Sequence, residues 1–194
     1  MPKYEYGRIA KLSEGLKKAK VDPKIIRKIM EGGESIRKST LPEKKTEWLR
    51  EAMLRMDKLL DLDTRRTVRE SCACCLGGKR LKLSKAIAKQ NDTLEERIRA
   101  ANETKFVFGH EVTMQNDGRI LVRFAPEGLL GYYCACLGRN VKEPLSRTYC
   151  FCCGGHVKHH LQIALGRNLL CETRSTALSS GGKEPCTFIF TIKD

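Results

Sequence analysis

The hydrophobic pattern of the chain changes its period at about Asn102, and this change constrains the fold more than any other feature. Before it, apolar residues recur three and four positions apart, which predicts five or six helices. The most regular of them covers 42–60, where an apolar stripe runs from Trp48 to Leu60. We therefore expect a helical region over residues 1–103.

Beyond that point apolar and polar residues alternate in short runs, as they do in strands. An Asn-Asp-Gly turn within 105–125 predicts a β-hairpin, and the alternation over 169–174 and 186–191 predicts two further strands. Apolar residues at helical spacing predict an amphipathic helix over 155–165. Residues 104–194 should thus form an antiparallel sheet with one C-terminal helix, which makes the whole protein α+β.

Ten cysteines are many for 194 residues, and eight of them fall in three tight groups. The N-terminus has neither the apolar core nor the small-residue cleavage site of a secretory signal. We therefore expect a cytoplasmic protein whose cysteines are thiols rather than disulfides. Clustered thiols in such a chain indicate a metal site or a reactive cysteine. The three groups are Cys72, Cys74 and Cys75; Cys134 and Cys136; and Cys150, Cys152 and Cys153.

The spacing of two of these groups suits a metal ion. Residues two apart share a face of a strand, so Cys134 and Cys136 can present two thiols from the strand or extended loop expected at 129–137. Cys150 and Cys152 can do the same from the adjacent segment. Two such pairs would form a four-sulfur tetrahedral site, for which we expect zinc, with iron as the alternative. The competing interpretation is buried free cysteine, which packs as a small hydrophobic residue.

Two cysteines are also candidates for a catalytic nucleophile. Cys152 and Cys153 lie just before the helix expected at 155–165, and the N-terminus of a helix lowers the pKa of a thiol. His156 follows closely and shares a helix face with His160. This pair could add metal ligands, but the lysine between them favours a solvated face.

The stretch 148–193 carries a recognisable set of residues: Cys150, Gly155, Gly166, Arg167, Glu172 and Cys186. It resembles the C-terminal half of the 4-vinyl-reductase-like domain, a family that includes the sensor domains of phenol-responsive transcription activators. The resemblance implies a helix packed on an antiparallel sheet and a pocket for a small molecule. In the phenol sensors the matching residues bind zinc, so the resemblance implies Cys150, Glu172 and Cys186 as ligands. Ser175 stands where the family has a further Cys.

The end of the chain, with its Gly-rich turn, Cys186 and Phe-x-Phe, is also similar to the L-2-amino-thiazoline-4-carboxylate hydrolases, which implies an enzyme. Our main expectation is a small-molecule-binding, cysteine-rich protein with a metal site. The alternative is a hydrolase that uses a cysteine thiolate or a metal-activated water. The candidate metal ligands are Cys134, Cys136, Cys150, Cys152, Glu172 and Cys186.

The formal net charge of +14 bears on the partners of the protein. The first hundred residues hold 26 Lys and Arg against 15 Asp and Glu, so 11 of the 14 excess charges lie in the helical region. We interpret them as a solvated surface, because no regularly placed aromatic residues accompany them to stack bases. A nucleic acid or an acidic partner is the alternative. No run approaches the roughly 20 apolar residues that span a membrane, so we expect no membrane partner; a homodimer is compatible with the sequence.

Overall fold

The structure is a computed structural model that describes residues 3–124, 134, 136–137, 141 and 143–193. Its helices and strands confirm the predicted α+β class. The helices are α1 (Gly7–Lys18), α2 (Pro23–Met30), α3 (Pro42–Leu59), α4 (Leu62–Ser71), α5 (Gly78–Gln90), α6 (Leu94–Glu103), α7 (Lys105–Phe108) and α8 (Arg147–Leu165). The strands are β1 (Glu111–Met114), β2 (Ile120–Arg123), β3 (Asn168–Ser175) and β4 (Thr187–Lys193).

Polar side chains and one glycine fix where several helices begin and end. The carboxylate of Asp22 accepts a hydrogen bond from the Lys24 amide at 2.6 Å and so caps α2. Thr93 and Glu96 form a capping box at the start of α6. At the end of α8, Gly166 adopts a left-handed conformation with φ 67°, which lets the chain leave the helix and enter β3.

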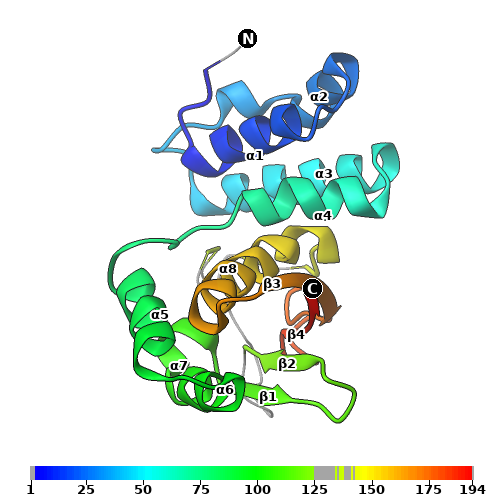
Figure 1. The fold of residues 1–194 in the computed structure, drawn as a ribbon. Helices are drawn as coiled ribbons and strands as arrows, with labels where there is room; N and C mark the ends of the chain where they lie inside the picture. The colour runs from blue at the N-terminus through cyan, green and yellow to red at the C-terminus, as the bar shows by residue number, and fades with distance from the viewer. Residues whose placement is uncertain (1–2, 125–133, 135, 138–140, 142, 194) are drawn as a thin grey trace.

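Helix α8 lies at the centre of the molecule (Figure 1). In this view α1 to α4 form a layer above it, and the sheet with α5, α6 and α7 lies below. Each layer has its own hydrophobic cluster, and α8 supplies residues to both. Tyr149 packs with the upper cluster, whereas Val157 and Leu161 pack with the lower one. Helices α5 and α6, which precede the boundary predicted at 103/104, thus share their cluster with the sheet that follows it.

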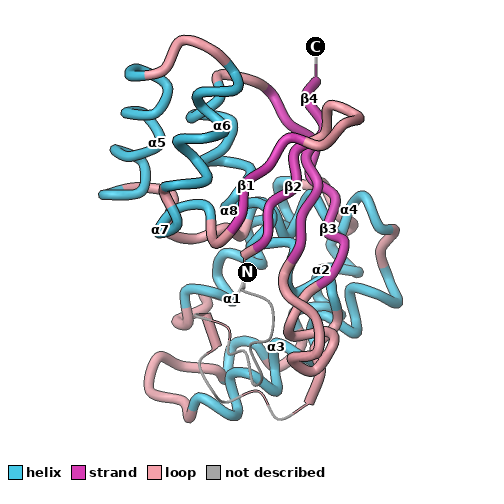
Figure 2. The backbone as a smooth tube through the Cα atoms, turned by 90° about the horizontal axis from the view of Figure 1, so that it is seen from below, coloured by secondary structure: helices cyan, strands magenta, loops and turns pink. Residues whose placement is uncertain are grey.

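The four strands form one antiparallel sheet in the order β1-β2-β4-β3 (Figure 2). The Asn-Asp-Gly turn joins β1 to β2, as expected, with Val112 opposite Val122. Val122 in turn lies opposite Phe188 of β4. The side chains of Val122, Phe188 and Phe190 are fully buried and belong to the same cluster as the later half of α8. The sheet therefore packs one face against the central helix.

Helix α8 includes 150–153, which the sequence predicts as part of a strand. Gly154 and Gly155, at the start of the helix predicted over 155–165, lie inside α8. A Cβ on Gly154 would lie 3.0 Å from Cys171 Sγ on β3. A Cβ on Gly155 would lie 2.5 Å from the backbone oxygen of Glu70 on α4. These glycines serve the close packing of α8 against both neighbours rather than a turn.

Residues 105–108 also differ from the prediction. The sequence places them in the first strand of the hairpin, but they form the single turn of α7, and β1 begins at Glu111. The side chains of Val107 and Phe108 are fully buried there, so tertiary packing overrides the alternating pattern. Of the strand or loop expected at 129–137, residues 129–133 and 135 lie outside the described residues.

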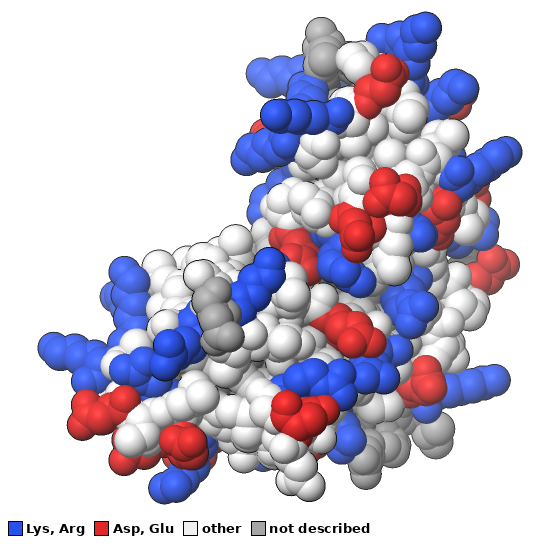
Figure 3. All heavy atoms as spheres, turned by 45° about the vertical axis from the view of Figure 1, so that its right-hand side comes forward, with Lys and Arg blue, Asp and Glu red and all other residues white. Residues whose placement is uncertain are grey.

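None of the helices within the described residues combines the length and apolar character needed to cross a membrane. Lys and Arg side chains spread over the face shown in Figure 3, with Asp and Glu between them. That face therefore carries no single uninterrupted cationic patch among the described residues.

Candidate functional site

The main candidate site is a cavity of about 200 Å³ that is lined by α1, the loop after α4, α8 and the residue before β4. All ten cysteines of the chain are free thiols, and eight of them line this cavity. The eight are Cys74, Cys75, Cys134, Cys136, Cys150, Cys152, Cys153 and Cys186. The fold thus brings members of all three sequence groups to one place.

Three of these thiols form a contact group. Cys74 Sγ lies 3.7 Å from Cys136 Sγ. Cys134 Sγ accepts a hydrogen bond from the Cys136 amide at 3.3 Å, and the two side chains are also hydrogen-bonded. A separation of 3.7 Å is far longer than a disulfide bond of about 2.05 Å. It matches the distance of about 3.8 Å between two sulfurs that each lie about 2.3 Å from one tetrahedral zinc ion.

The negative charge of this group rests on Cys136. Hydrogen bonds donated by the thiols of Cys134 and Cys74 lower the pKa of Cys136. The guanidinium of Arg8 interacts electrostatically with the same sulfur and lowers this pKa further. The same bonds raise the pKa of Cys74 and Cys134, because each thiol keeps the proton that it donates. Of these three thiols, Cys136 is therefore the one whose surroundings favour the thiolate.

The cysteines of α8 are neutral thiols instead. Burial raises the pKa of Cys150, Cys152 and Cys153. The helix begins at Arg147, so these residues lie inside it rather than just before its N-terminus, where a thiol would gain acidity. Of the described cysteines around the cavity, Cys136 rather than Cys152 or Cys153 has the environment of a thiolate.

Two histidines of α8 hold the loop that carries Cys74. His156 Nδ1 donates to the Cys74 carbonyl oxygen at 2.9 Å, and His160 Nε2 donates to the Cys75 carbonyl oxygen at 3.0 Å. His160 Nδ1 is also hydrogen-bonded to the Ser84 hydroxyl at 3.0 Å. The rings of His156 and His160 are only 8% and 0% exposed. The predicted solvated face is therefore wrong, and both histidines position the loop through its backbone.

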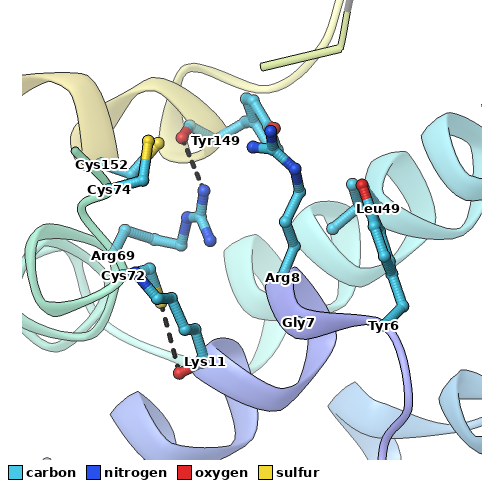
Figure 4. A pocket seen from close by; sticks show the side chains of 10 residues that line it. All are labelled: Tyr6, Gly7, Arg8, Lys11, Leu49, Arg69, Cys72, Cys74, Tyr149 and Cys152. Carbon is cyan, nitrogen blue, oxygen red and sulfur yellow. Dashed lines mark hydrogen bonds between the residues drawn. The ribbon is translucent and has the colours of Figure 1, made fainter. Parts of the chain in front are cut away.

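A second cavity of about 270 Å³ adjoins the first and shares four lining residues with it: Arg8, Cys74, Tyr149 and Cys152. Figure 4 shows the side chains of Arg8 and Arg69 reaching into it from α1 and α4. Arg69 is 4% exposed and donates from Nη2 to the Tyr149 carbonyl oxygen at 2.9 Å. Its guanidinium carbon lies 4.9 Å from the centre of the Tyr149 ring. Two guanidinium groups therefore border the thiols.

Five of the six predicted metal ligands line the first cavity, namely Cys134, Cys136, Cys150, Cys152 and Cys186. Glu172 does not line it: the side chain is half-exposed on β3 and pairs with Arg174 at 3.1 Å. Its neighbour Cys171 is buried on the opposite face, as the two-residue period of a strand requires. Ser175 donates its hydroxyl to a backbone oxygen at 2.6 Å and does not line the cavity either.

Three residues of the site are missing from the predicted set. Cys74 could have been predicted from the sequence, because it belongs to one of the three cysteine groups. Arg8 and Arg69 could not have been predicted, since nothing in the sequence distinguishes them from the other Lys and Arg residues, which number 37 in all. Only the packing of α1 and α4 near α8 distinguishes them from the rest.

The fold and the site define a cysteine-rich α+β protein with a thiol-lined cavity beside one central helix. The chain belongs to the family described as a family of unknown function, DUF6144, which matches residues 9–183. No curated protein and no solved structure matches the chain.

Proposed function

We propose that the protein binds a zinc ion through Cys74, Cys134 and Cys136, with Cys152 as the fourth ligand, at the wall of a small-molecule cavity. The proposal rests on one observation, the separation of 3.7 Å between the sulfurs of Cys74 and Cys136, which is the spacing of two ligands on one tetrahedral ion. Iron is the alternative metal, since it accepts the same four-sulfur geometry.

The charges around the thiols support this ligand set. A zinc ion with four thiolates carries two net negative charges, and buried charges require partners of opposite sign. Arg8 interacts electrostatically with Cys136, and Arg69 does so with Cys152. Arg8 and Arg69 could therefore balance the two negative charges of the zinc site.

Metal binding requires a small rearrangement of the thiols. Among the described residues, no three His, Cys, Asp or Glu side chains already stand as a metal site. The third and fourth sulfurs, those of Cys134 and Cys152, must therefore move toward the pair formed by Cys74 and Cys136. Thiols release their protons as they bind, so the affinity for zinc rises with pH.

A zinc ion with four protein ligands has no open position, so its role would be structural. It would join the loop after α4 to α8 and to residues 134 and 136. Glu172 is left out of this set, because its carboxylate lies on the other face of β3 from the buried Cys171.

The test is to measure zinc and iron in protein purified without chelator, under nitrogen, with a phosphine reductant. We expect about one zinc ion per chain. Cys74→Ser and Cys136→Ser should each lose it, because a hydroxyl is a poor zinc ligand. Cys171→Ser is the matched control: this thiol lies outside the cavity, so the metal content should not change.

Two results would count against the proposal. Folded protein that contains no zinc or iron, and takes up neither when it is added, contradicts metal binding. An unchanged metal content in both Cys74→Ser and Cys136→Ser contradicts the ligand set.

A hydrolase with Cys136 as its nucleophile is the second candidate, and the pairing of this thiolate with Arg8 favours it. An acidic thiol at the wall of a cavity is what covalent catalysis by cysteine requires. If the protein holds no metal, and iodoacetamide modifies Cys136 before every other thiol at pH 6, this function replaces the zinc site.

A further inference from the structure

The second cavity is cationic. Its charged lining residues are Arg8, Lys11 and Arg69, and none of the described Asp or Glu residues lines it. Lys11 donates from Nζ to the backbone oxygen of Ala73 at 3.0 Å, which leaves further N–H groups of the ammonium available. Figure 4 shows these three side chains around one hollow between α1, α4 and α8.

Arg69 lacks a counter-ion within the described part of the chain. Its neighbours on α4, Arg65 and Arg66, pair with Asp57 and Asp63, but Arg69 has no such pair. Its Nη2 bonds a neutral carbonyl oxygen, and its Nε is buried without an acceptor. A buried charge is unfavourable unless a partner compensates it.

The thiols compensate only part of this charge. Without metal, the second cavity is lined by three cationic side chains and by none of the described Asp or Glu residues. With zinc and four thiolates, the site holds two negative charges, whereas Arg8, Lys11 and Arg69 bring three positive ones. The cavity therefore keeps a positive charge in either state.

We propose that this cavity binds a small organic oxyanion, a molecule with a carboxylate, phosphate or sulfate group, and that this group lies between Arg69 and Lys11. Guanidinium and ammonium groups bind oxyanions through charge-assisted hydrogen bonds. The site deepens the small-molecule part of the proposed function, and it does not depend on the metal.

The rest of the cavity wall suits the organic part of such a ligand. The rings of Tyr6 and Tyr149 and the side chain of Leu49 line it. Small-molecule sites commonly combine apolar and aromatic walls with a few polar groups that fix orientation. The volume of about 270 Å³ limits the ligand to a small metabolite. Cys74 and Cys152 line the same space, so the bound molecule would lie beside the thiols.

The test is calorimetric titration with inorganic phosphate, sulfate and acetate at constant ionic strength, on both zinc-loaded and zinc-free protein. We expect at least one of the three anions to bind to both the zinc-loaded and the zinc-free protein. The anion that binds most tightly indicates the anionic group of the natural ligand. Arg69→Gln should raise its dissociation constant by about tenfold or more, and Lys11→Gln by a few-fold. Lys18→Gln is the matched control: it removes the same charge from α1 at an exposed position outside the cavity and should change nothing.

Failure of this site can be told apart from failure of the zinc site, because the zinc content of every sample is measured separately. Absence of binding by all three anions overturns the proposal. Equal weakening by Lys11→Gln and Lys18→Gln also overturns it, since it would show attraction to the general surface charge. If Arg69→Gln does not fold, the test relies on the charge reversal Lys11→Glu at the exposed end of the cavity. This variant should abolish anion binding.

Discussion

Three neighbouring groups lower the pKa of Cys136. Two are the thiols of Cys134 and Cys74, and the third is the guanidinium of Arg8. The clustering of cysteines predicts thiols that act together. It cannot predict which of them ionises, because the bonds from Cys134 and Cys74 and the cation of Arg8 come together only in the fold.

Replacing Arg8 by Gln should therefore raise the pKa of Cys136. In zinc-free protein, alkylation of this thiol by iodoacetamide should slow at pH values below the raised pKa, by up to about tenfold if the pKa rises by one unit, because only the thiolate reacts. Mass spectrometry of the modified peptide measures the rate. Arg8→Lys keeps a cation and should slow it less. An unchanged rate in Arg8→Gln would mean that Arg8 does not stabilise the thiolate.

His160 should make stability depend on pH. Burial lowers its pKa from 6.5 to about 4, and the nearby His156, His159 and Arg80 add to this, while its bond to the Cys75 carbonyl oxygen opposes it. In the unfolded chain His160 takes up a proton near pH 6.5, whereas in the native state it does so only near pH 4. This contribution to stability is thus fully present above pH 6.5 and falls toward pH 4, by at most about 3 kcal/mol.

Urea unfolding midpoints between pH 7.5 and pH 4.5 would measure this effect, with roughly one unfolding curve per half pH unit. His160→Gln should flatten the profile, because the replaced side chain no longer titrates. A variant with the same slope as the parent protein would assign the pH dependence to other groups.

Among the helices longer than one turn, α8 departs most from the extent that the sequence predicts. Helices α1 to α6 each present an apolar stripe toward one layer, so their periodicity is visible. Helix α8 lies between two layers, and around 149–157 it is buried on most of its circumference. A helix buried on all sides loses the stripe on which such predictions depend, and its two glycines then resemble a break.

Gly155 should be the position on α8 most sensitive to a small change. A Cβ there would lie 2.5 Å from the backbone oxygen of Glu70, so α4 and α8 would have to separate. We expect Gly155→Ala to lower the free energy of unfolding by about 1–3 kcal/mol. Gly7→Ala is the control, since nothing lies within 4 Å of its added Cβ, and it should be neutral or slightly stabilising. Equal stability of the two variants would contradict the close contact.

For the whole molecule, the sequence predicts the class of fold and the importance of thiols, but it does not predict the two cavities. Their walls come from α1, α4 and α8 together with residues 134 and 136. The residues that decide their charge, Arg8, Lys11 and Arg69, belong to a helical region whose many cations otherwise suggest a solvated surface. Only the packing of the two layers on α8 brings these three cations to one cavity.

Zinc should stabilise the molecule as a whole, because the proposed ligands come from segments far apart in the chain. At a free zinc concentration about 1,000 times its dissociation constant, the gain is about 4 kcal/mol. A chelator should therefore lower the thermal unfolding midpoint, and added zinc should restore it, as measured by scanning calorimetry. Cys136→Ser should show no response to either. A parent protein that does not respond would indicate that its native state does not bind zinc.

The central position of α8 also has a consequence for how the protein is made. Both hydrophobic clusters need this helix, yet it begins only at Arg147. During translation α1 to α4 leave the ribosome long before the helix that covers them. The hydrogen bond from Arg69 to the carbonyl oxygen of Tyr149 cannot form until Tyr149 has also emerged. The early helices therefore emerge with one apolar side exposed to chaperones and proteases. A chain truncated before α8 would lack the helix that both clusters need. We therefore expect its N-terminal layer to be incompletely folded, as well as its sheet.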